Sequence, residues 1–537
     1  MTLLRVDKLS VTFGKKQVLN GTAFSLSAGE ILAIAGESGS GKSTAALAIA
    51  HLLPAAARVS GSVLLEGDDL NAKGERALCG IRGRDIGLVF QEPMTALNPV
   101  MQVGDQIAES LRLHRRISRS EAREAVRNLL ERVGLIDIPA TRYPHELSGG
   151  QRQRVAIAIA IACSPKLIIA DEPTTALDVT TQAQVLALFR QLVREERIGL
   201  ILITHDLAVV AETADRIAIM NKGRIVEEGT TLQVLREPRH ASTRELVEAL
   251  SRFPDRISKP RNGRPLLEVS NLVRHYGGRF LNRGTQTAVA DVSFTVEQGE
   301  SVGIVGESGS GKSTLLRAVL GLDRPNGGDV RIAGTAISSA RGKKRLDVRR
   351  KVQAVFQDPL SSFDPRHHIG RVVAEPLHLL GENLGRVERR KRAEAALERV
   401  GLPARMADRY PHEFSGGQRQ RIAIARALII EPALIALDEA VSALDVSARA
   451  QIVELLNGLS RDLGVAYLFV THDLSLVRSI TDRLIVMRAG RIVETGATGD
   501  VLSAPQHPYT AALLAATPDL RRALGAGRTA AAADIAK

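Results

Sequence analysis

The residues most able to do chemistry lie in a glycine-rich string that the chain contains twice. Gly-Glu-Ser-Gly-Ser-Gly-Lys-Ser-Thr occurs at 36–44 and again, unchanged, at 306–314. Both copies fit the pattern G-x-x-x-x-G-K-[ST], in which glycines let successive backbone N–H groups curve around a phosphate. A lysine at this spacing reaches the β- and γ-phosphates of a nucleotide, and the hydroxyl after it binds Mg²⁺. The sequence therefore predicts two sites for a nucleoside triphosphate.

The members of the two strings are the predicted phosphate-binding residues. The first copy consists of Gly36, Glu37, Ser38, Gly39, Ser40, Gly41, Lys42, Ser43 and Thr44. The second copy consists of Gly306, Glu307, Ser308, Gly309, Ser310, Gly311, Lys312, Ser313 and Thr314. Of these, Ser43 and Ser313 are the predicted hydroxyl ligands of Mg²⁺.

An Asp-Glu pair closes an apolar run in each half of the chain. Asp171 and Asp438 are expected to help hold Mg²⁺ through water. Glu172 and Glu439 are candidate general bases for the attacking water, a role worth about 10²–10⁴-fold in rate. The alternative, a solvated carboxylate pair after a strand, is disfavoured by the glycine-rich strings upstream.

Histidine and glutamine also recur in both halves. A single histidine after a strand is usually structural, but His205 and His472 occupy corresponding places, which favours a catalytic role. Gln91 and Gln357 follow apolar runs and are predicted to contact Mg²⁺ or the attacking water. Each glutamine by itself would carry no information.

Ser-Gly-Gly-Gln is a second glycine-rich turn, and it is predicted to open a helix in each half. Its residues are Ser148, Gly149, Gly150 and Gln151, and Ser415, Gly416, Gly417 and Gln418. A helix N-terminus is a good anion site, yet the phosphate site of each half is already complete. The simplest use is to bind the γ-phosphate of a nucleotide held by the other half, so that the nucleotide joins the halves.

The constant spacing of these motifs indicates a duplicated domain. The Ser-Gly-Gly-Gln strings are 415 − 148 = 267 residues apart, and the Asp-Glu pairs and Thr-His-Asp strings share this offset. We predict domains at 1–251 and 266–512, a linker at 252–265 rich in Pro, Gly and charge, and a tail at 513–537. The last residues of the tail, 525–537, are expected to be mobile.

Short apolar runs must position the motifs. They occupy 31–35, 167–170 and 200–204 in the first half, and 302–305, 434–437 and 466–471 in the second. Runs of this length, bounded by turn formers, suit strands buried on both faces of a parallel sheet. Functional residues at the carboxyl ends of such strands match the rule for ligand sites in open α/β sheets.

Composition is that of an ordinary globular protein. Of 537 residues, 44% are apolar and 24% are charged, and no stretch approaches the roughly 18 apolar residues of a membrane span. Charges near the N-terminus argue against a signal peptide, so we expect a cytosolic protein. A net charge of +13 would permit nucleic acid, but aromatic residues, at 3%, do not interleave with the basic runs. The two cysteines, Cys79 and Cys163, are predicted to be small buried side chains.

In combination, these motifs resemble the ATP-binding-cassette (ABC) ATPases over nearly all of residues 3–512. The resemblance implies two P-loop NTPase domains, each a RecA-like, mostly parallel α/β core with an antiparallel β subdomain and a helical subdomain. On this pattern, Phe13 and Tyr276 resemble the aromatic residue that stacks on adenine. Gln91 and Gln357 resemble the Q-loop glutamines, and 176–178 and 443–445 resemble the D-loops at the dimer interface.

Four strings make the chain similar to the fused ATPases of the dipeptide/oligopeptide/nickel importer family. They occupy 90–99, 143–150, 170–179 and 505–510. This resemblance implies ATP and Mg²⁺ as cofactors, two transmembrane permease subunits as partners and, indirectly, a periplasmic or extracellular solute-binding protein. It implies no nucleic acid partner and no direct membrane insertion, with the chain peripheral at the cytoplasmic face of the inner membrane. Helical subdomains at about 93–146 and 359–413 would move the permeases.

The halves differ at a few positions, none of which removes a predicted phosphate or water ligand. Ile159 stands where the second half has Arg426, Ala440 replaces the proline at 173, and His-Ala-Ser-Thr at 240–243 replaces His-Pro-Tyr-Thr at 507–510. Both sites are therefore expected to be competent, whereas a sugar-importer ATPase would have a degraded second site. A soluble tandem ABC ATPase acting on ribosomes or nucleic acid is the alternative, but its halves would be joined by a long helical connector.

Overall fold

The protein divides into two compact units in a computed structural model that describes residues 2–91, 96–175, 177–251, 256, 263–277, 286–382, 384–441, 444–520 and 522–524. The first unit comprises Met1–Ser251 together with Pro518–Lys537, and the second comprises Arg252–Thr517. The same element order recurs in each unit, as a duplicated domain requires.

A six-stranded sheet with the order β10-β9-β3-β8-β7-β6 is the core of the first unit. Its strands are β3 (Ile31–Ala35), β6 (Ile86–Val89), β7 (Leu167–Asp171), β8 (Gly199–Thr204), β9 (Arg216–Asn221) and β10 (Arg224–Thr230). All neighbours are parallel except β9 and β10. Every residue of β3 and β8 is buried, because helices cover both faces of a sheet of this kind.

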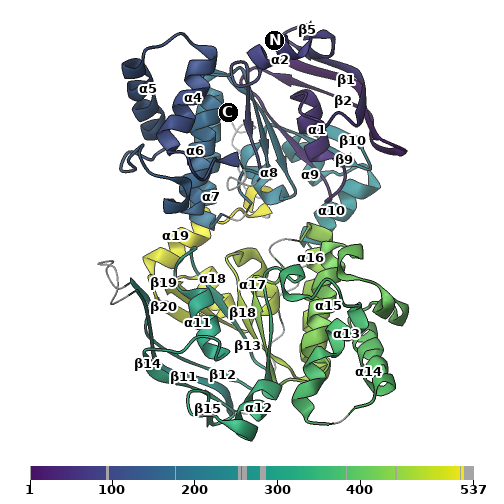
Figure 1. Ribbon diagram of the computed structural model, residues 1–537, viewed down its shortest axis with the longest axis vertical. Helices are drawn as coiled ribbons and strands as arrows, with labels where there is room; N and C mark the ends of the chain where they lie inside the picture. The colour runs from purple at the N-terminus through teal and green to yellow at the C-terminus, as the bar shows by residue number, and fades with distance from the viewer. Residues whose placement is uncertain are drawn as a thin grey trace, which may run out of the picture. The chain divides into compact units, whose positions relative to one another are not determined.

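The first unit also contains an antiparallel sheet with the order β2-β1-β4-β5. Its strands are β1 (Thr2–Phe13), β2 (Lys16–Ser27), β4 (Ala57–Leu65) and β5 (Asp68–Asp69). The helices are α1 (Lys42–Ile49), α2 (Glu75–Ile81), α4 (Val103–His114), α5 (Arg119–Arg132), α6 (Gly149–Ile161), α7 (Val179–Glu196), α8 (Leu207–Thr213), α9 (Thr231–Arg236) and α10 (Ala241–Ser251). In Figure 1, α4 and α5 lie on the side of the unit opposite β1 and β2.

The second unit repeats both sheets, with the orders β12-β11-β14-β15 and β16-β17-β18-β13-β19-β20. The strands are β11 (Pro265–Tyr276), β12 (Gln286–Glu297), β13 (Ser301–Val305), β14 (Gly327–Ile332), β15 (Thr335–Ala336), β16 (Val352–Val355), β17 (Leu434–Asp438), β18 (Ala466–Val470), β19 (Arg483–Arg488) and β20 (Arg491–Ala497). The helices are α11 (Lys312–Val319), α12 (Gly342–Lys351), α13 (Ile369–Ala374), α14 (Arg386–Arg399), α15 (Gly416–Leu428), α16 (Val446–Leu463), α17 (Leu474–Ile480), α18 (Thr498–Ser503) and α19 (Pro508–Ala516).

The predicted strands are confirmed. The three apolar runs of the first half are β3, β7 and β8, and those of the second half are β13, β17 and β18. Each predicted boundary lies within one residue of the observed one, because a buried run ends where the first turn-forming or polar residue appears. The α/β fold predicted from these runs is therefore the fold of both units.

The chain after α19 belongs to the first unit, which differs from the predicted organisation of the tail. Helix α19 continues past residue 512 because Leu513 is buried in an apolar cluster of the second unit. Beyond Thr517 the chain joins the first unit, where Leu520 is only 8% exposed and packs in a cluster with Leu235 and Leu246. Residues 525–537, predicted to be mobile, lie outside the described residues.

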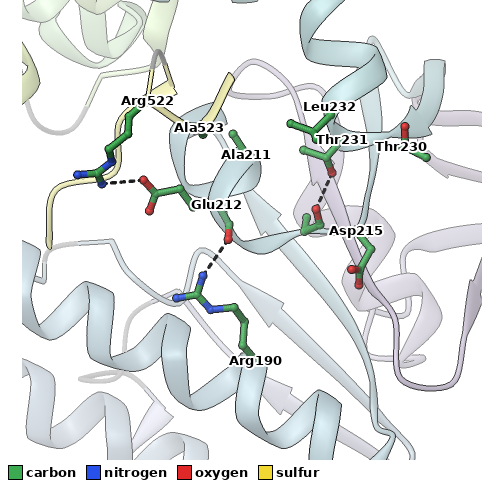
Figure 2. Close-up of a pocket in the computed structure, with 10 residues that line it drawn as sticks. Arg190, Ala211, Glu212, Asp215, Thr230, Thr231, Leu232, Arg522 and Ala523 are labelled. Carbon is green, nitrogen blue, oxygen red and sulfur yellow. Dashed lines mark hydrogen bonds and ion pairs between the residues drawn. The ribbon is translucent and has the colours of Figure 1, made fainter. Parts of the chain in front are cut away.

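Glu212 holds this C-terminal segment in place (Figure 2). Its carboxylate accepts hydrogen bonds from the backbone N–H of Asp519, at 3.2 Å, and from the Arg522 guanidinium, at 3.0 Å. Arg236 donates to the carbonyl of Leu524. An open pocket of about 730 Å³ remains between the segment and helices α8 and α9, with Arg190 on another of its walls.

The chain after α10 belongs to the second unit. Of the predicted linker, residues 252–265, the structure describes only Arg256 and 263–265. The Arg256 guanidinium donates to Asp482 at 2.9 Å, to Asn457 at 3.1 Å and to Ser460 at 2.9 Å. Each unit is therefore completed by a segment that follows the last helix of the other unit.

Candidate active site

The first glycine-rich string forms a loop between strand β3 and helix α1. Gly36, Gly39 and Gly41 have φ values of 155°, 78° and 106°, and a Cβ on Gly36 would lie 2.2 Å from the carbonyl oxygen of Met220. Only glycine fits this path, because other residues rarely adopt such φ values. Lys42 is buried, and its Nζ donates to the carbonyls of Gly36 and Glu37 at 2.8 Å each.

The second string forms the same loop between β13 and α11. A Cβ on Gly306 would lie 2.2 Å from the carbonyl oxygen of Met487, and one on Gly311 would lie 2.3 Å from that of Ala288. The Lys312 Nζ donates to the carbonyls of Gly306 and Glu307 at 2.7 Å each. Both lysines are thus held beside the loop that the sequence predicts to surround a phosphate.

The predicted Mg²⁺ ligands lie next to one another in each unit. Asp171 ends β7, and burial raises its pKa, with a hydrogen bond from Ser43 opposing this and the charge of Glu172 adding to it. Burial likewise raises the pKa of Asp438, with the charge of Glu439 adding to it and a hydrogen bond from Ser313 opposing it. Oδ1 of each aspartate is buried and has no hydrogen-bond partner in the described part of the chain.

These orphaned oxygens fit Mg²⁺, which prefers oxygen ligands and compensates the charge of a buried carboxylate. The described residues contain no group of three or more His, Cys, Asp or Glu side chains that could hold a metal ion by themselves. Such a donor set suits Mg²⁺, since this ion usually takes one or two carboxylates together with substrate phosphates and water. Gln91 and Gln357, also predicted as ligands, are exposed.

Glu172 is surrounded by hydrogen-bond donors. Its Oε1 lies 3.0 Å from Nδ1 of His205, and its Oε2 accepts from Gln91 Nε2 and from Thr175 Oγ1, each at 3.0 Å. Its φ of 46° turns the side chain out of the strand line, and its N–H donates to Ile203 of β8 at 2.9 Å. Burial alone would raise the pKa of Glu172, but the hydrogen bond and charge of His205 outweigh burial and lower it.

Glu439 has the same backbone and the same histidine partner. Its φ is 47°, its N–H donates to Val470 at 2.9 Å, and Oε1 lies 3.1 Å from Nδ1 of His472. Burial would raise the pKa of Glu439, yet the hydrogen bond from His472 lowers it overall. Burial would lower the pKa of His472, yet the Glu439 carboxylate raises it overall. Both glutamates are therefore ionised near neutral pH, as a general base requires.

The two units differ at the predicted Q-loop glutamine. Gln91 donates to Glu172, whereas no hydrogen bond joins Gln357 to Glu439 in the part of the chain that the structure describes. Residues 92–95, which follow Gln91, lie outside the described residues.

The Ser-Gly-Gly-Gln strings open helices α6 and α15, as predicted. In the first, the N–H of Ser148 donates to Gln151 Oε1 at 2.9 Å, and the N–H of Gln151 donates to Ser148 Oγ at 3.3 Å. Ser415 and Gln418 make the same reciprocal pair, at 3.1 and 3.4 Å. This arrangement is a capping box, which fixes the start of each helix. The serine and the first glycine of each string are exposed, and the residues that follow are half-buried.

The glycines of these strings let two helix starts approach closely. A Cβ on Gly150 would lie 2.3 Å from Cγ2 of Thr181, and one on Gly417 would lie 3.1 Å from Cβ of Ala448. Thr181 belongs to α7, whose N-cap Asp178 accepts from the Thr181 N–H at 2.9 Å. The predicted D-loop residues 176 and 443 lie outside the described residues, whereas Asp178 bonds Thr181, the residue that lies against Gly150.

The two aromatic residues predicted to stack on adenine lie at the ends of corresponding strands. Phe13 ends β1 and is partly buried against an apolar cluster of the first unit. Tyr276 ends β11 and is 37% exposed. The Arg274 guanidinium lies 4.6 Å from the centre of the Tyr276 ring, and the Tyr276 hydroxyl donates to Asp323.

Two contacts of this site were not predicted from the sequence, and the predicted burial of one cysteine is wrong. Thr175, which donates to Glu172, lies three residues after it, a spacing that could have suggested the contact. Tyr509, whose hydroxyl meets the second glycine-rich loop, stands where the two halves differ in sequence. Cys163 is buried as predicted, but the prediction for Cys79 is wrong: it is exposed, because its position on the short helix α2 faces away from the core.

Comparisons with known proteins identify the family of the chain. The ABC transporter family matches residues 19–175 and 289–442, and the oligopeptide/dipeptide transporter C-terminal region matches 493–536. The chain is 46% identical to the glutathione import ATP-binding protein GsiA of Escherichia coli, over 96% of this chain and 89% of that protein. The GsiA of Shigella flexneri gives the same identity and coverage.

Solved structures of single cassettes are also similar. The cassette MJ0796, determined in a state bound to ADP and Pi, is 32% identical, covers 43% of this chain and 98% of its own, and gives a TM-score of 0.40. The cbiO1 protein of Clostridium perfringens is 29% identical, covers 45% and 91% respectively, and gives 0.39. No helix in the described residues is both long and apolar enough to cross a membrane. From the family matches and the identity to GsiA, the chain belongs to the ABC transporter ATPases, as a tandem-cassette ATP-binding protein with the oligopeptide/dipeptide transporter C-terminal region.

Proposed function

We propose that the chain hydrolyses ATP with Mg²⁺ at two sites and couples this to the uptake of peptides or peptide-like compounds. The observation that carries the hydrolytic part is the half-buried Glu–His pair in each cassette, with Nδ1 and Oε1 3.0 Å apart in one cassette and 3.1 Å apart in the other. Its repetition with the same strained backbone at both glutamates supports two working sites rather than one.

The site residues divide the work between binding and proton transfer. Lys42 and Lys312 leave their loop carbonyls to contact the β- and γ-phosphates. Bound Mg²⁺ would supply positive charge to the phosphate oxygens, held by Ser43 and Asp171 in the first cassette and by Ser313 and Asp438 in the second. In adenine binding, Phe13 and Tyr276 supply the stacking surface.

Glu172 and Glu439 take the proton of the attacking water. The water oxygen bonds to the γ-phosphorus, the bond from that phosphorus to the bridging oxygen breaks, and ADP and phosphate leave. His205 and His472 keep the carboxylates ionised and oriented through their hydrogen bonds, and Gln91 contributes a third donor in the first cassette.

Each site is completed, in this proposal, by the Ser-Gly-Gly-Gln turn of the other cassette. The exposure of Ser148 and Gly149 at the start of α6, and of their counterparts at the start of α15, supports this role, because an exposed helix start is available to an anion. Cysteine pairs replacing Ser148 and Ser313, or Ser415 and Ser43, should cross-link in the presence of ATP. Failure of both pairs to cross-link in an ATP-trapped protein would overturn the composite sites.

Two membrane permease subunits are the proposed partners, with a solute-binding protein acting through them and the chain peripheral at the cytoplasmic face of the inner membrane. The peptide-like substrate is supported by the match of residues 493–536 to the oligopeptide/dipeptide region and by the glutathione import named for GsiA. These comparisons favour an importer ATPase over a soluble ATPase acting on ribosomes.

The hydrolytic proposal is tested by changing both bases. The double variant Glu172→Gln and Glu439→Gln should still bind ATP, while its hydrolysis falls by at least about 10²-fold, since a general base contributes about 10²–10⁴-fold. Radiolabelled ATP binding and phosphate release measure the two properties separately. Near-normal turnover in the double variant would remove the assignment of the base.

A further inference from the structure

The second glycine-rich loop donates a hydrogen bond that has no counterpart at the first loop among the described residues. The backbone N–H of Glu307 donates to the hydroxyl oxygen of Tyr509 at 3.0 Å. Tyr509 belongs to helix α19, about two hundred residues further along the chain and within the region matched to oligopeptide/dipeptide transporters.

This bond acts on the peptide group that also holds the phosphate-binding lysine. The N–H of Glu307 and the carbonyl of Gly306 belong to the same planar peptide unit. That carbonyl accepts from Lys312 Nζ at 2.7 Å. The peptide unit is therefore held at one end by Tyr509 and at the other by Lys312, and hydrogen bonds in such a chain strengthen one another.

Packing and neighbouring contacts hold the Tyr509 side chain beside the loop. The residue is 7% exposed, and its ring packs in the cluster that contains Val305, the last residue of β13 before the loop. The Arg488 guanidinium lies 4.9 Å from the ring centre, and the Tyr509 N–H donates to Nδ1 of the N-cap His507 at 3.1 Å. A side chain with so little freedom loses little entropy when its hydroxyl is used.

The first cassette has a different pair at the corresponding positions. With the offset of 267 residues, Ser242 corresponds to Tyr509 and Asn221 to Arg488. These two residues bond each other, Asn221 Nδ2 donating to Ser242 Oγ at 2.7 Å. No protein hydrogen bond from the N–H of Glu37 is found in the described part of the chain, so the first loop lacks this support.

We propose that Tyr509 is a positioning residue of the second ATP site. By holding the Gly306–Glu307 peptide unit, it keeps the second loop in the form that receives a phosphate before ATP arrives, which raises the ATP affinity of that site relative to the first. The inference rests on the proposed function, because it assumes that both loops bind ATP.

The test replaces Tyr509 with Phe, which keeps the ring in the apolar cluster and removes only the hydroxyl. It is made in two full-length backgrounds, Lys42→Ala, which leaves the second loop intact, and Lys312→Ala, which leaves the first. The probe is a fluorescent ATP analogue with Mg²⁺, and the measurement is its Kd. Losing one hydrogen bond should weaken binding about three- to tenfold in the Lys42→Ala background and leave it unchanged in the other.

A matched control and a stability measurement separate positioning from general damage. Ser242→Ala in the Lys312→Ala background should leave the Kd unchanged, and Tyr509→Phe should leave the second cassette's thermal unfolding near that of the parent. An unchanged Kd in the Lys42→Ala background, or an equal rise in both backgrounds, would overturn the inference while leaving the proposed function intact. Absence of ATP-analogue binding in the unmodified chain would instead overturn the proposed function and this inference with it.

Discussion

The two active sites share their charged groups and differ in their neutral contacts. Both have a lysine on the loop carbonyls, an aspartate with an orphaned oxygen and a Glu–His pair with nearly the same distance. Within the described residues, Gln91 donates to the base of the first site and Tyr509 accepts from the loop of the second, and neither contact has a counterpart in the other site. The two copies thus share the residues that bear charge and differ in some of the neutral contacts around them.

This difference teaches that equal chemistry does not require equal tuning. A charged group at such a site is expensive to remove, because its buried partner is left uncompensated. A neutral hydrogen bond is worth only about 0.5–1.5 kcal/mol, so it can be gained or lost without abolishing the site. We therefore expect that replacing a charged group slows hydrolysis by a similar factor in whichever site it is replaced. Replacing a neutral group should matter at one of the two sites.

The largest effect should come from removing one base at a time. Glu172→Gln or Glu439→Gln should each abolish most turnover at its own site, by about 10²–10⁴-fold. Single-turnover hydrolysis with each glycine-rich lysine replaced in turn would assign the loss to one site. A much larger fall in turnover at one site than at the other would contradict the expectation that the charged groups work equally in both sites.

Removing a histidine partner should be the next largest change. His205→Ala and His472→Ala each take away a hydrogen bond to an ionised carboxylate, worth about 1.5–3 kcal/mol. If the whole of this acts on the transition state, the rate at that site falls by about 10- to 150-fold. Because both pairs have the same geometry, the two losses should agree within a few-fold when phosphate release is measured.

Replacing the glutamines should slow hydrolysis less, and mainly at the first site, to judge from their hydrogen bonds without bound ATP. Gln91→Ala removes a donor from Glu172 and should slow the first site by a few-fold, in proportion to one neutral hydrogen bond. Gln357→Ala removes no hydrogen bond from Glu439 and should change the second site less. Equal effects in pre-steady-state hydrolysis would mean that Gln357 reaches Glu439 once nucleotide is bound.

The smallest effect concerns stability and pH in the second cassette. The raised pKa of His472 contributes stability that is complete below its ordinary value of 6.5 and is lost as pH rises through the folded value. The lowered pKa of Glu439 contributes stability present above 4.5 and lost as pH falls through its folded value. The pair should therefore stabilise most between these pH values. Denaturant unfolding of His472→Asn should therefore show a smaller loss of stability than the parent as pH rises above 6.5.

Much of the fold and the charged site could be predicted from the sequence because local patterns determine them. A buried five-residue run such as 31–35 has few alternatives to a central strand, and a glycine-rich loop needs its glycines wherever it occurs. The same spacing in both halves predicted that Glu172, His205 and their counterparts lie at the carboxyl ends of strands. These predictions required only distances along the chain.

The remaining features depend on residues that approach only after folding. Tyr509 reaches Glu307 across about two hundred residues, and nothing in its local sequence specifies that partner. The different hydrogen bonding of Gln91 and Gln357 likewise cannot be read from the sequence, since both glutamines occur in the dipeptide Phe-Gln. The boundary predicted at residue 512 was set by loss of patterning, whereas α19 continues to Ala516, past the buried Leu513.

The first unit takes its last segment from the far end of the chain, so residues 1–251 by themselves do not make a complete unit. A polypeptide of residues 1–251 would lack Leu520, leaving the apolar surface of Leu235 and Leu246 open to water. Burying one leucine is worth about 1.5–3 kcal/mol, a sizeable share of the margin that keeps a domain folded. Expressing the chain as two polypeptides divided at the linker would therefore leave apolar surface exposed on both. Cleaving the linker of the folded protein would instead leave Leu520 packed in its cluster.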